Sequence, residues 1–94
     1  MRTKAKRDAN ESDIIDALRS IGATVQPISE TNVPDLLVGF RGVNLLMEVK
    51  IPKGKLSTGQ KSWHDTWEGQ RAVVRSVDEA LSVLGILYSQ EHKK

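Results

Sequence analysis

Two apolar runs joined by a short glycine-containing turn limit the possible folds of this chain more than any other feature. The runs occupy residues 33–50, and the turn falls at Arg41-Gly42. A two-residue loop there defines the register of a β-hairpin and sets Asp35 directly opposite Glu48. Side chains alternate along a strand, so Glu48 and Lys50 share one face. Two carboxylates at that spacing destabilise each other, and the hairpin therefore predicts a cation between them.

The composition is that of one small globular domain. With 94 residues, of which 38% are hydrophobic and 28% charged, we expect a modest core that self-association would help to stabilise. No apolar run approaches ~18 residues and no apolar segment follows the N-terminal charges, so we expect no membrane span, no signal peptide and a cytoplasmic protein. Because cysteine is absent, a bound metal would be held by oxygen or imidazole, which favours Mg²⁺ or Mn²⁺.

Basic residues gather in three places, although the formal net charge is only +2. In the two tails they are explained equally well as solvated charges or as nucleic-acid contacts. Next to the acids of the hairpin we favour a functional role. The clusters are Arg2, Lys4, Lys6 and Arg7, then Lys50, Lys53 and Lys55, and finally Lys93 and Lys94; all except Lys50 and the last two are candidates for DNA binding.

The rest of the chain alternates helical and extended patterns. Residues 1–9 lack apolar periodicity and are predicted to form a flexible basic arm, followed by a single domain over residues 10–94. Capping boxes, Ser57 with Gln60 and Ser76 with Glu79, indicate two helix starts. The expected elements are a helix capped by Asn10 and ended by Gly22, a strand at 23–28, the two hairpin strands, a helix at 57–68, a strand at 72–76, a short helix at 76–85 and an apolar tail at 86–88.

This order, α-β-β-β-α-β-α, predicts one α/β domain. The hairpin runs at 36–38 and 45–47 are nearly unbroken apolar segments, typical of strands covered on both faces, so we expect helices on both sides of the sheet. Pro27 places the first strand at an edge. Pro52 and Gly54 then predict a flexible basic loop beside the hairpin.

Glu11 lies on the apolar stripe of the first helix. Positions 11, 14, 15 and 18 follow the helical spacing i, i+3, i+4, i+7, so Glu11 faces whatever this helix packs against. One interpretation is a first-turn acid favoured by the helix dipole. The other is a third acid directed at Asp35 and Glu48.

The helix at 57–68 carries an aromatic stripe. Gln60, Trp63, His64 and Trp67 follow the same spacing. Core packing is the ordinary explanation of the two tryptophans, and base stacking is the alternative. His64 has no second histidine or cysteine at ligand spacing, so we expect a half-buried histidine rather than a metal ligand.

Asp35, Glu48 and Lys50 together suggest a particular chemistry. Carboxylates are hard oxygen ligands suited to Mg²⁺, and such a cation polarises a phosphate and lowers the pKa of water. A lysine beside it can orient that water and offset the charge that grows on the phosphate. The set predicts phosphodiester hydrolysis.

The same residues carry a family resemblance. Pro34-Asp35, then twelve residues, then Glu48-Val49-Lys50 resemble the motif of the PD-(D/E)xK nucleases, the restriction-endonuclease-like superfamily. Asn10-Glu11, the hairpin, and Leu56-Ser57 with Gln60 make the chain similar to stand-alone VRR-NUC domains of phages, whose core archaeal Holliday junction resolvases share. The resemblance covers about residues 10–85.

The resemblance implies roles for the matching residues. Lys50 would be the catalytic lysine, and Gln60 would face the site from the second helix. Relatives usually carry glycine where this chain has Val33, which bears on substrate access near Asp35. The implied set is Glu11, Asp35, Glu48, Lys50 and Gln60 as catalytic residues, with Asp35, Glu48, the backbone carbonyl of Val49 and, through water, Glu11 as metal ligands.

The resemblance also implies a restriction-endonuclease-like fold, with a mixed four-stranded sheet flanked by helices, and an Mg²⁺- or Mn²⁺-dependent DNA endonuclease. Related small members are homodimers, in which two sites would cut branched DNA such as Holliday junctions. The similarity to phage domains also implies a phage-encoded protein that acts in a host cell. The alternative is a non-catalytic nucleic-acid-binding module on the same fold. A purely structural α/β protein would set Asp35 and Glu48 on opposite faces of the sheet.

Overall fold

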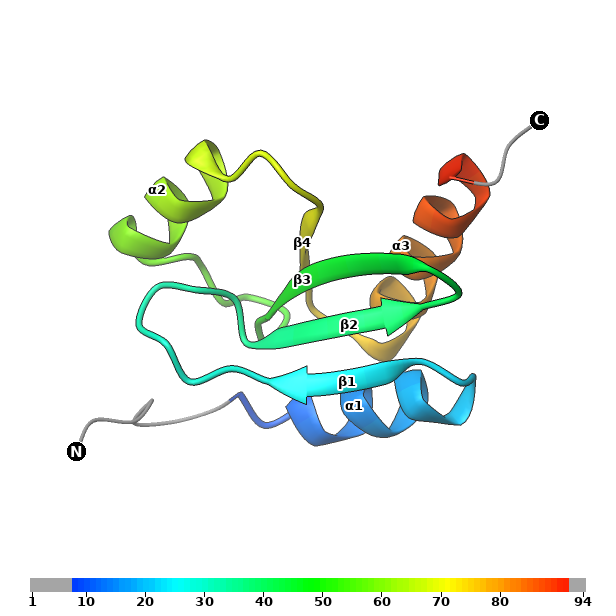
Figure 1. The fold of residues 1–94 in the computed structure, drawn as a ribbon. Coiled ribbons are helices and arrows are strands. Elements are labelled where there is room, and N and C mark those ends of the chain that lie inside the picture. Colours follow the sequence, from blue (N-terminus) through cyan, green and yellow to red (C-terminus); the bar gives the residue numbers. More distant parts are fainter. Residues whose placement is uncertain (1–7, 92–94) are drawn as a thin grey trace.

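The computed structural model describes residues 8–91, without the side chains of residues 87 and 89–91 (Figure 1). The elements follow the expected order, which confirms the predicted α/β class. The basic arm lies outside the described residues except for residues 8 and 9, and so do its candidates Arg2, Lys4, Lys6 and Arg7. The elements are α1 (Glu11–Ser20), β1 (Thr24–Pro27), β2 (Leu36–Phe40), β3 (Val43–Val49), α2 (Thr58–Thr66), β4 (Arg71–Val74) and α3 (Val77–Glu91).

The four strands form one mixed sheet in the order β1-β2-β3-β4. The first three strands are antiparallel, as short connections allow, whereas β4 pairs parallel to β3. A parallel neighbour requires a crossover connection, and α2 lies in that crossover. The predicted mixed four-stranded sheet is therefore confirmed.

The β2–β3 hairpin has the predicted register. Leu36 pairs with Met47 and Phe40 with Val43. The turn residues Arg41 and Gly42 have φ values of 51° and 86°, the positive angles of a two-residue hairpin loop whose twist matches the flanking strands. Continuing this register by one residue brings Asp35 opposite Glu48.

Helices α1 and α3 pack against one face of the sheet and against each other. Every second residue of β2 and β3 is buried there, because side chains alternate across a strand. Each fully buried aliphatic side chain contributes on the order of 1.5–3 kcal/mol. The core on this face consists of Ile14, Leu18, Ala23, Leu36, Val38, Leu45, Met47, Val49, Val74, Ala80 and Leu84.

The opposite face of β2 and β3 is partly open. Leu37 is 42% exposed and Asn44 is also exposed, so the expectation that helices cover both faces is wrong at these positions. Helix α2 packs only lightly against the sheet and lies near the end of β3, away from α1 and α3 (Figure 1). An apolar run does not reveal how far the neighbouring helix extends over it.

Helix α3 is longer than its sequence predicts. The expected end at Gly85 is wrong, because the helix continues through Gly85 to Glu91 and includes the predicted apolar tail. Packing at the far end compensates for the low helix propensity of glycine. The Tyr88 ring lies edge-on to Phe40 at 6.0 Å between centroids, and the Arg41 guanidinium lies 5.6 Å from the Tyr88 ring centre.

Helix α1 begins and ends where the sequence predicts, but its N-terminus lacks the expected side-chain cap. Gly22 adopts φ 96° after its last turn, a conformation that favours glycine at a helix C-terminus. Asn10 is the N-cap residue, as predicted, but its side chain makes no capping hydrogen bond. Within residues 8–91, no helix has both the length and the apolar character needed to cross a bilayer.

Candidate active site

Two buried carboxylates lie together at the open end of the β2–β3 hairpin. Asp35 directly precedes β2 and is 7% exposed, and Glu48, in β3, is 1% exposed. Pro34, itself fully buried, restricts the backbone that enters β2. The Val49 backbone N–H donates a hydrogen bond of 2.8 Å to Asp35 Oδ2. This hydrogen bond holds the Asp35 carboxylate against the β3 backbone, at the residue that follows Glu48.

Lys50 lies on the same side of β3 as Glu48. Its Nζ is 3.8 Å from Glu48 Oε2, and only 16% of its side chain is exposed. The Lys50 backbone N–H donates to the Val74 carbonyl at 3.0 Å, so the lysine remains tied to β4 although β3 ends one residue earlier. A largely buried ammonium group therefore stands beside the acid pair.

Gln60 connects α2 to Glu48 through a predicted capping box. Ser57 Oγ accepts from the Gln60 backbone N–H at 3.1 Å, and Gln60 Oε1 accepts from the Ser57 backbone N–H at 2.9 Å. The remaining amide group is thus oriented, and Nε2 donates to Glu48 Oε2 at 3.2 Å. One side chain both starts the helix and holds the carboxylate.

The Val49 carbonyl lies on the β2 side of β3. The backbone N–H groups of Leu46 and Lys50 donate to the β4 side, to the carbonyls of Gln70 and Val74. Backbone groups alternate direction along a strand, so those of Val49 point toward β2. Its N–H meets Asp35 there, and its carbonyl therefore lies on the same side as that acid.

The donor set fits a hard divalent cation. Two buried carboxylates and a backbone carbonyl supply only oxygen, the ligand type of Mg²⁺ and Mn²⁺. Burying two neighbouring negative charges is costly unless positive charge balances them. Among the described residues no three histidine, cysteine or acidic side chains gather into a metal cluster, so a metal here would depend on Asp35, Glu48 and the Val49 carbonyl.

Glu11 is buried, as its place on the α1 stripe predicts. It is 4% exposed and shares its helix face with Ile14 and Leu18, which are fully buried. It lines a hollow with Ile15 and Pro27 at the end of β1. Glu11 is therefore more than an exposed first-turn acid, and its contact with the metal through water stays a prediction.

Asn10 links three elements near Lys50, a contact that the sequence did not predict. Its Nδ2 donates to the carbonyls of Lys50 and Arg75, each at 3.1 Å. These carbonyls lie just after the ends of β3 and β4. The asparagine thus fixes the backbone that carries the lysine, over separations of 40 and 65 residues that local sequence patterns cannot reveal.

The aromatic stripe of α2 is not part of the core. Trp67 is 42% exposed and Trp63 is half-buried, so the core-packing explanation is wrong for this pair. His64 is more buried than expected, at 9% exposed, and its Nε2 has no hydrogen-bond partner among the described residues. Burial lowers the pKa of His64, the positive charge of Arg71 acts in the same direction, and Asp65 opposes both.

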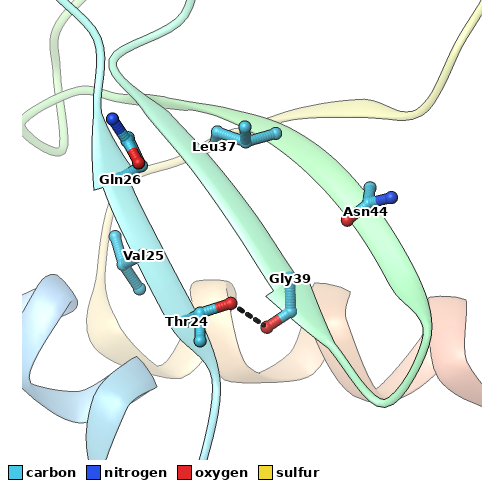
Figure 2. Close-up of a pocket in the computed structure, with 6 residues that line it drawn as sticks. All are labelled: Thr24, Val25, Gln26, Leu37, Gly39 and Asn44. Carbon is cyan, nitrogen blue, oxygen red and sulfur yellow. Dashed lines mark hydrogen bonds between the residues drawn. The ribbon is translucent and has the colours of Figure 1, made fainter.

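A shallow hollow on the open sheet face is separate from the acid site (Figure 2). Its volume is about 180 Å³. Thr24 Oγ1 donates to the Gly39 carbonyl at 3.2 Å, and a Cβ at Gly39 would come within 2.9 Å of that hydroxyl. The lining carries no ionisable group and so supplies no acid or base. It consists of Thr24, Val25, Gln26, Leu37, Gly39 and Asn44.

The basic loop after β3 is anchored to Arg75, the residue that follows β4. Gly54 donates its N–H to the Ile51 carbonyl at 2.9 Å, which closes a turn. The guanidinium of Arg75 donates to the Gly54 carbonyl at 3.0 Å. Lys53 and Lys55 are both exposed in this loop, where they can reach a polyanion that approaches Lys50.

The mixed sheet, with the hairpin acids at one end and α2 in the β3–β4 crossover, is consistent with the predicted restriction-endonuclease-like fold. No protein-family model and no curated protein matches the sequence. Among solved structures, a chain described as a VRR_NUC domain is similar to this one with a TM-score of 0.68 and 24% identity, over 89% of this chain and 92% of that chain. The chain therefore has the VRR-NUC type of this fold, as its motifs predict.

Proposed function

We propose that this protein is a metal-dependent nuclease that hydrolyses phosphodiester bonds in DNA. The observation that carries the proposal is the convergence of polar groups on Glu48. Lys50 Nζ lies 3.8 Å and Gln60 Nε2 lies 3.2 Å from its Oε2, and Asp35 is held beside it. An acid pair with a neighbouring cation and an oriented amide is suited to stabilising a phosphate that gains charge. The VRR-NUC fold supports the same function.

Each side chain has a distinct task in the proposed reaction. Lys50 orients the attacking water and offsets the charge that develops on the phosphate oxygens. Gln60 keeps the Glu48 carboxylate in one orientation, and the Val49 N–H does the same for Asp35. A bond forms between the water oxygen and phosphorus while the bond from phosphorus to the 3′ oxygen breaks. The water's proton ends on the leaving oxygen, which gives 5′-phosphate and 3′-hydroxyl ends.

Mg²⁺ or Mn²⁺ is the proposed cofactor. Asp35, Glu48 and the Val49 carbonyl would hold it, with Glu11 contributing through water. When bound, the ion supplies Lewis-acid activation of the phosphate and of water. The two buried carboxylates are the feature of this chain that favours a cation, because their charges would otherwise repel within a poorly solvated site.

The proposed substrate is branched DNA, cut by a homodimer. A small chain gains stability by self-association, and two symmetry-related sites would place one cut on each of two strands. Sedimentation velocity at micromolar concentration tests the dimer directly. Such an enzyme would act in the cytoplasm, in a host cell if the protein is encoded by a phage.

A cleavage assay on matched DNA substrates tests the proposal. Supercoiled plasmid, a linear duplex and a four-way junction are each incubated with Mg²⁺, Mn²⁺ or EDTA. We expect metal-dependent cleavage by the parent protein, with the junction preferred, and its loss in Glu48→Gln and Lys50→Ala. Glu30→Gln is the matched control, because it removes the same charge from an exposed acid in the loop that precedes β2, whereas Glu48 is buried.

Three outcomes of this assay would change the proposal. Salt-sensitive binding without cleavage would replace the nuclease by a binding module on the same fold. Cleavage that survives in Glu48→Gln would remove the acid pair from the mechanism. Equal cutting of junction and linear duplex would leave the nuclease but remove its preference for branched DNA.

A further inference from the structure

Trp63 of α2 and Trp67, the C-cap residue of that helix, form a stacked pair. Their ring centroids are 4.8 Å apart and the ring planes differ by 15°. Trp67 is 42% exposed, and neither ring belongs to the hydrophobic core. Two adjacent, partly exposed aromatic rings are costly to hydrate, and such pairs mark interaction sites more often than single exposed apolar side chains do. The pair is therefore a candidate interaction site.

The pair is continuous with the candidate active site. Trp63 and Trp67 lie three and seven residues after Gln60 on the same helix face, which corresponds to about 4.5 and 10.5 Å along the axis. Gln60 itself contacts Glu48. A ligand that lies on the indoles is therefore within about two helical turns of the acid pair.

The charge around α2 favours a polyanion. Residues 50–71 contain five basic and two acidic side chains, a net charge of +3, whereas the whole chain carries only +2. Arg71 anchors one end of this region, because its Nε donates to the His64 carbonyl at 3.2 Å. Lys53 and Lys55 lie at the other end, in the loop that precedes α2. Basic side chains therefore lie on both sides of the aromatic pair along the chain, and they outnumber the two acids of the segment, Asp65 and Glu68.

We infer that Trp63 and Trp67 are a stacking platform for unpaired DNA bases beside the cleavage site. Indole faces stack on nucleobases with little regard to sequence, and paired bases inside a duplex do not expose their faces. The inference rests on the proposed nuclease function and names the substrate class of that site: DNA with a single-stranded segment or a branch point. It gives the preference for branched DNA a physical cause.

A second copy of this chain is the competing occupant, and the charge disfavours it. In a two-fold dimer the same surface meets itself. In such a dimer each copy would bring a segment 50–71 with a net charge of +3 to the contact, and like charges across an interface weaken association. The phosphates next to an unpaired base instead complement this charge.

Tryptophan fluorescence offers a direct test, because Trp63 and Trp67 are the two tryptophans of the chain. The full chain is titrated in EDTA with three oligonucleotides: a blunt duplex, the same duplex with a natural single-stranded overhang, and that duplex with an overhang of abasic sites. The two overhangs carry the same phosphates and differ only in their bases. We expect strong quenching by the natural overhang and little by the other two.

Two variants separate stacking from folding and from charge. Trp67→Ala should weaken binding of the natural overhang roughly tenfold and leave binding of the blunt duplex unchanged. Trp67→Phe keeps an aromatic face and should recover part of the loss. Circular dichroism and thermal melting of both variants check that α2 is intact. The comparison of natural and abasic overhangs uses the parent protein and so remains valid even if a variant misfolds.

Equal quenching by natural and abasic overhangs, or no quenching at all, would overturn the inference. So would a Trp67→Ala variant that dissociates a dimer while its affinity for the natural overhang stays the same. The two proposals can fail independently. If the protein shows no metal-dependent cleavage but distinguishes the two overhangs, the nuclease is rejected and the stacking platform is kept. If it cleaves DNA but does not distinguish the overhangs, only the stacking platform is rejected.

Discussion

Met47 and Glu48 are neighbours in β3, and both are almost completely buried, yet they lie in opposite environments. Met47 faces the apolar core beneath α1 and α3. Glu48 faces the other side, where an amide and an ammonium group contact its carboxylate. One strand therefore carries an apolar core contact on one face and a hydrogen-bonded, buried acid on the other. Burial alone does not separate the two roles, but the neighbours of each buried group do.

The two sides also differ in how they are held together. The packed side depends on many nonpolar contacts that tolerate changes of similar volume. The Glu48 side depends on a few directed hydrogen bonds from Ser57, Gln60 and Val49. We therefore expect substitutions on the packed side to change mainly stability, and substitutions on the other side to change mainly cleavage.

The largest expected effect is that of Glu48→Gln on cleavage. Removing the charge should lower the rate by at least about 10²-fold, by comparison with the loss of one stabilising group in other active sites. The free energy of unfolding should change little, because the lower cost of burying a neutral amide offsets the loss of the ion pair with Lys50. Initial rates and urea melts measure the two effects. A large loss of stability would contradict the division between the two sides.

Met47→Ala should have the opposite profile. Truncating this fully buried side chain should lower the free energy of unfolding by about 2–5 kcal/mol through lost burial and a remaining cavity. The cleavage rate per folded molecule should change little. Urea unfolding combined with cleavage at low temperature, where the variant is folded, provides the measurement. A rate loss as large as that of Glu48→Gln would mean that the two faces are not independent.

Asn10→Ala tests the link between the packed helix α1 and the backbone of the site. Two hydrogen bonds to the Lys50 and Arg75 carbonyls would be lost, at about 0.5–1.5 kcal/mol each. Amide hydrogen exchange should accelerate at Lys50, whose N–H bonds to Val74, and remain slow in the hairpin near Leu45. Uniform acceleration in both places would show a global loss of stability instead of a local clamp.

Ser57→Ala and Ser76→Ala form a matched pair of helix caps. Each should cost about 1 kcal/mol of stability, because each removes a side-chain acceptor from a helix start. Only the first should also slow cleavage, since Ser57 orients the Gln60 amide that contacts Glu48. Thermal melts and cleavage rates of both variants test the difference. Equal cleavage rates of the two variants would show that the Ser57–Gln60 capping box does not influence cleavage.

The smallest expected effect is the pH dependence due to His64. Its pKa in the folded protein lies below the usual 6.5 because of burial. As the pH falls below about 6.5, the unfolded chain takes up a proton that the folded chain does not, so stability decreases. Melting temperatures between pH 7.5 and 5 should fall less in His64→Gln than in the parent protein. The same pH dependence in both would contradict the buried, neutral imidazole.

The local features of the site were predictable from the sequence. The turn at Arg41-Gly42 and the two-residue alternation of the strands give the register that places Asp35 opposite Glu48. The capping box identifies Ser57 and Gln60 as a helix start. These features depend on residues that are close in the chain, and for such features sequence patterns carry the required information.

The features that sequence patterns missed depend on distant contacts. Asn10 was expected to cap α1, yet it contacts two strand ends far away in the chain. Gly85 was expected to end α3, but the helix continues to Glu91. In this extension Tyr88 packs against Phe40, a residue that is distant in the chain. The exposure of Leu37 and Trp67 depends on where α2 lies, which apolar periodicity does not specify.

The central claim is that the buried acids Asp35 and Glu48 form a divalent-metal centre. Melting temperature during a Mn²⁺ titration tests it most directly, because a ligand that binds the folded state raises stability with its concentration. We predict a concentration-dependent rise for the parent protein and for Glu30→Gln, and none for Asp35→Asn or Glu48→Gln. An equal rise in all four proteins, or no rise in the parent, would contradict the claim.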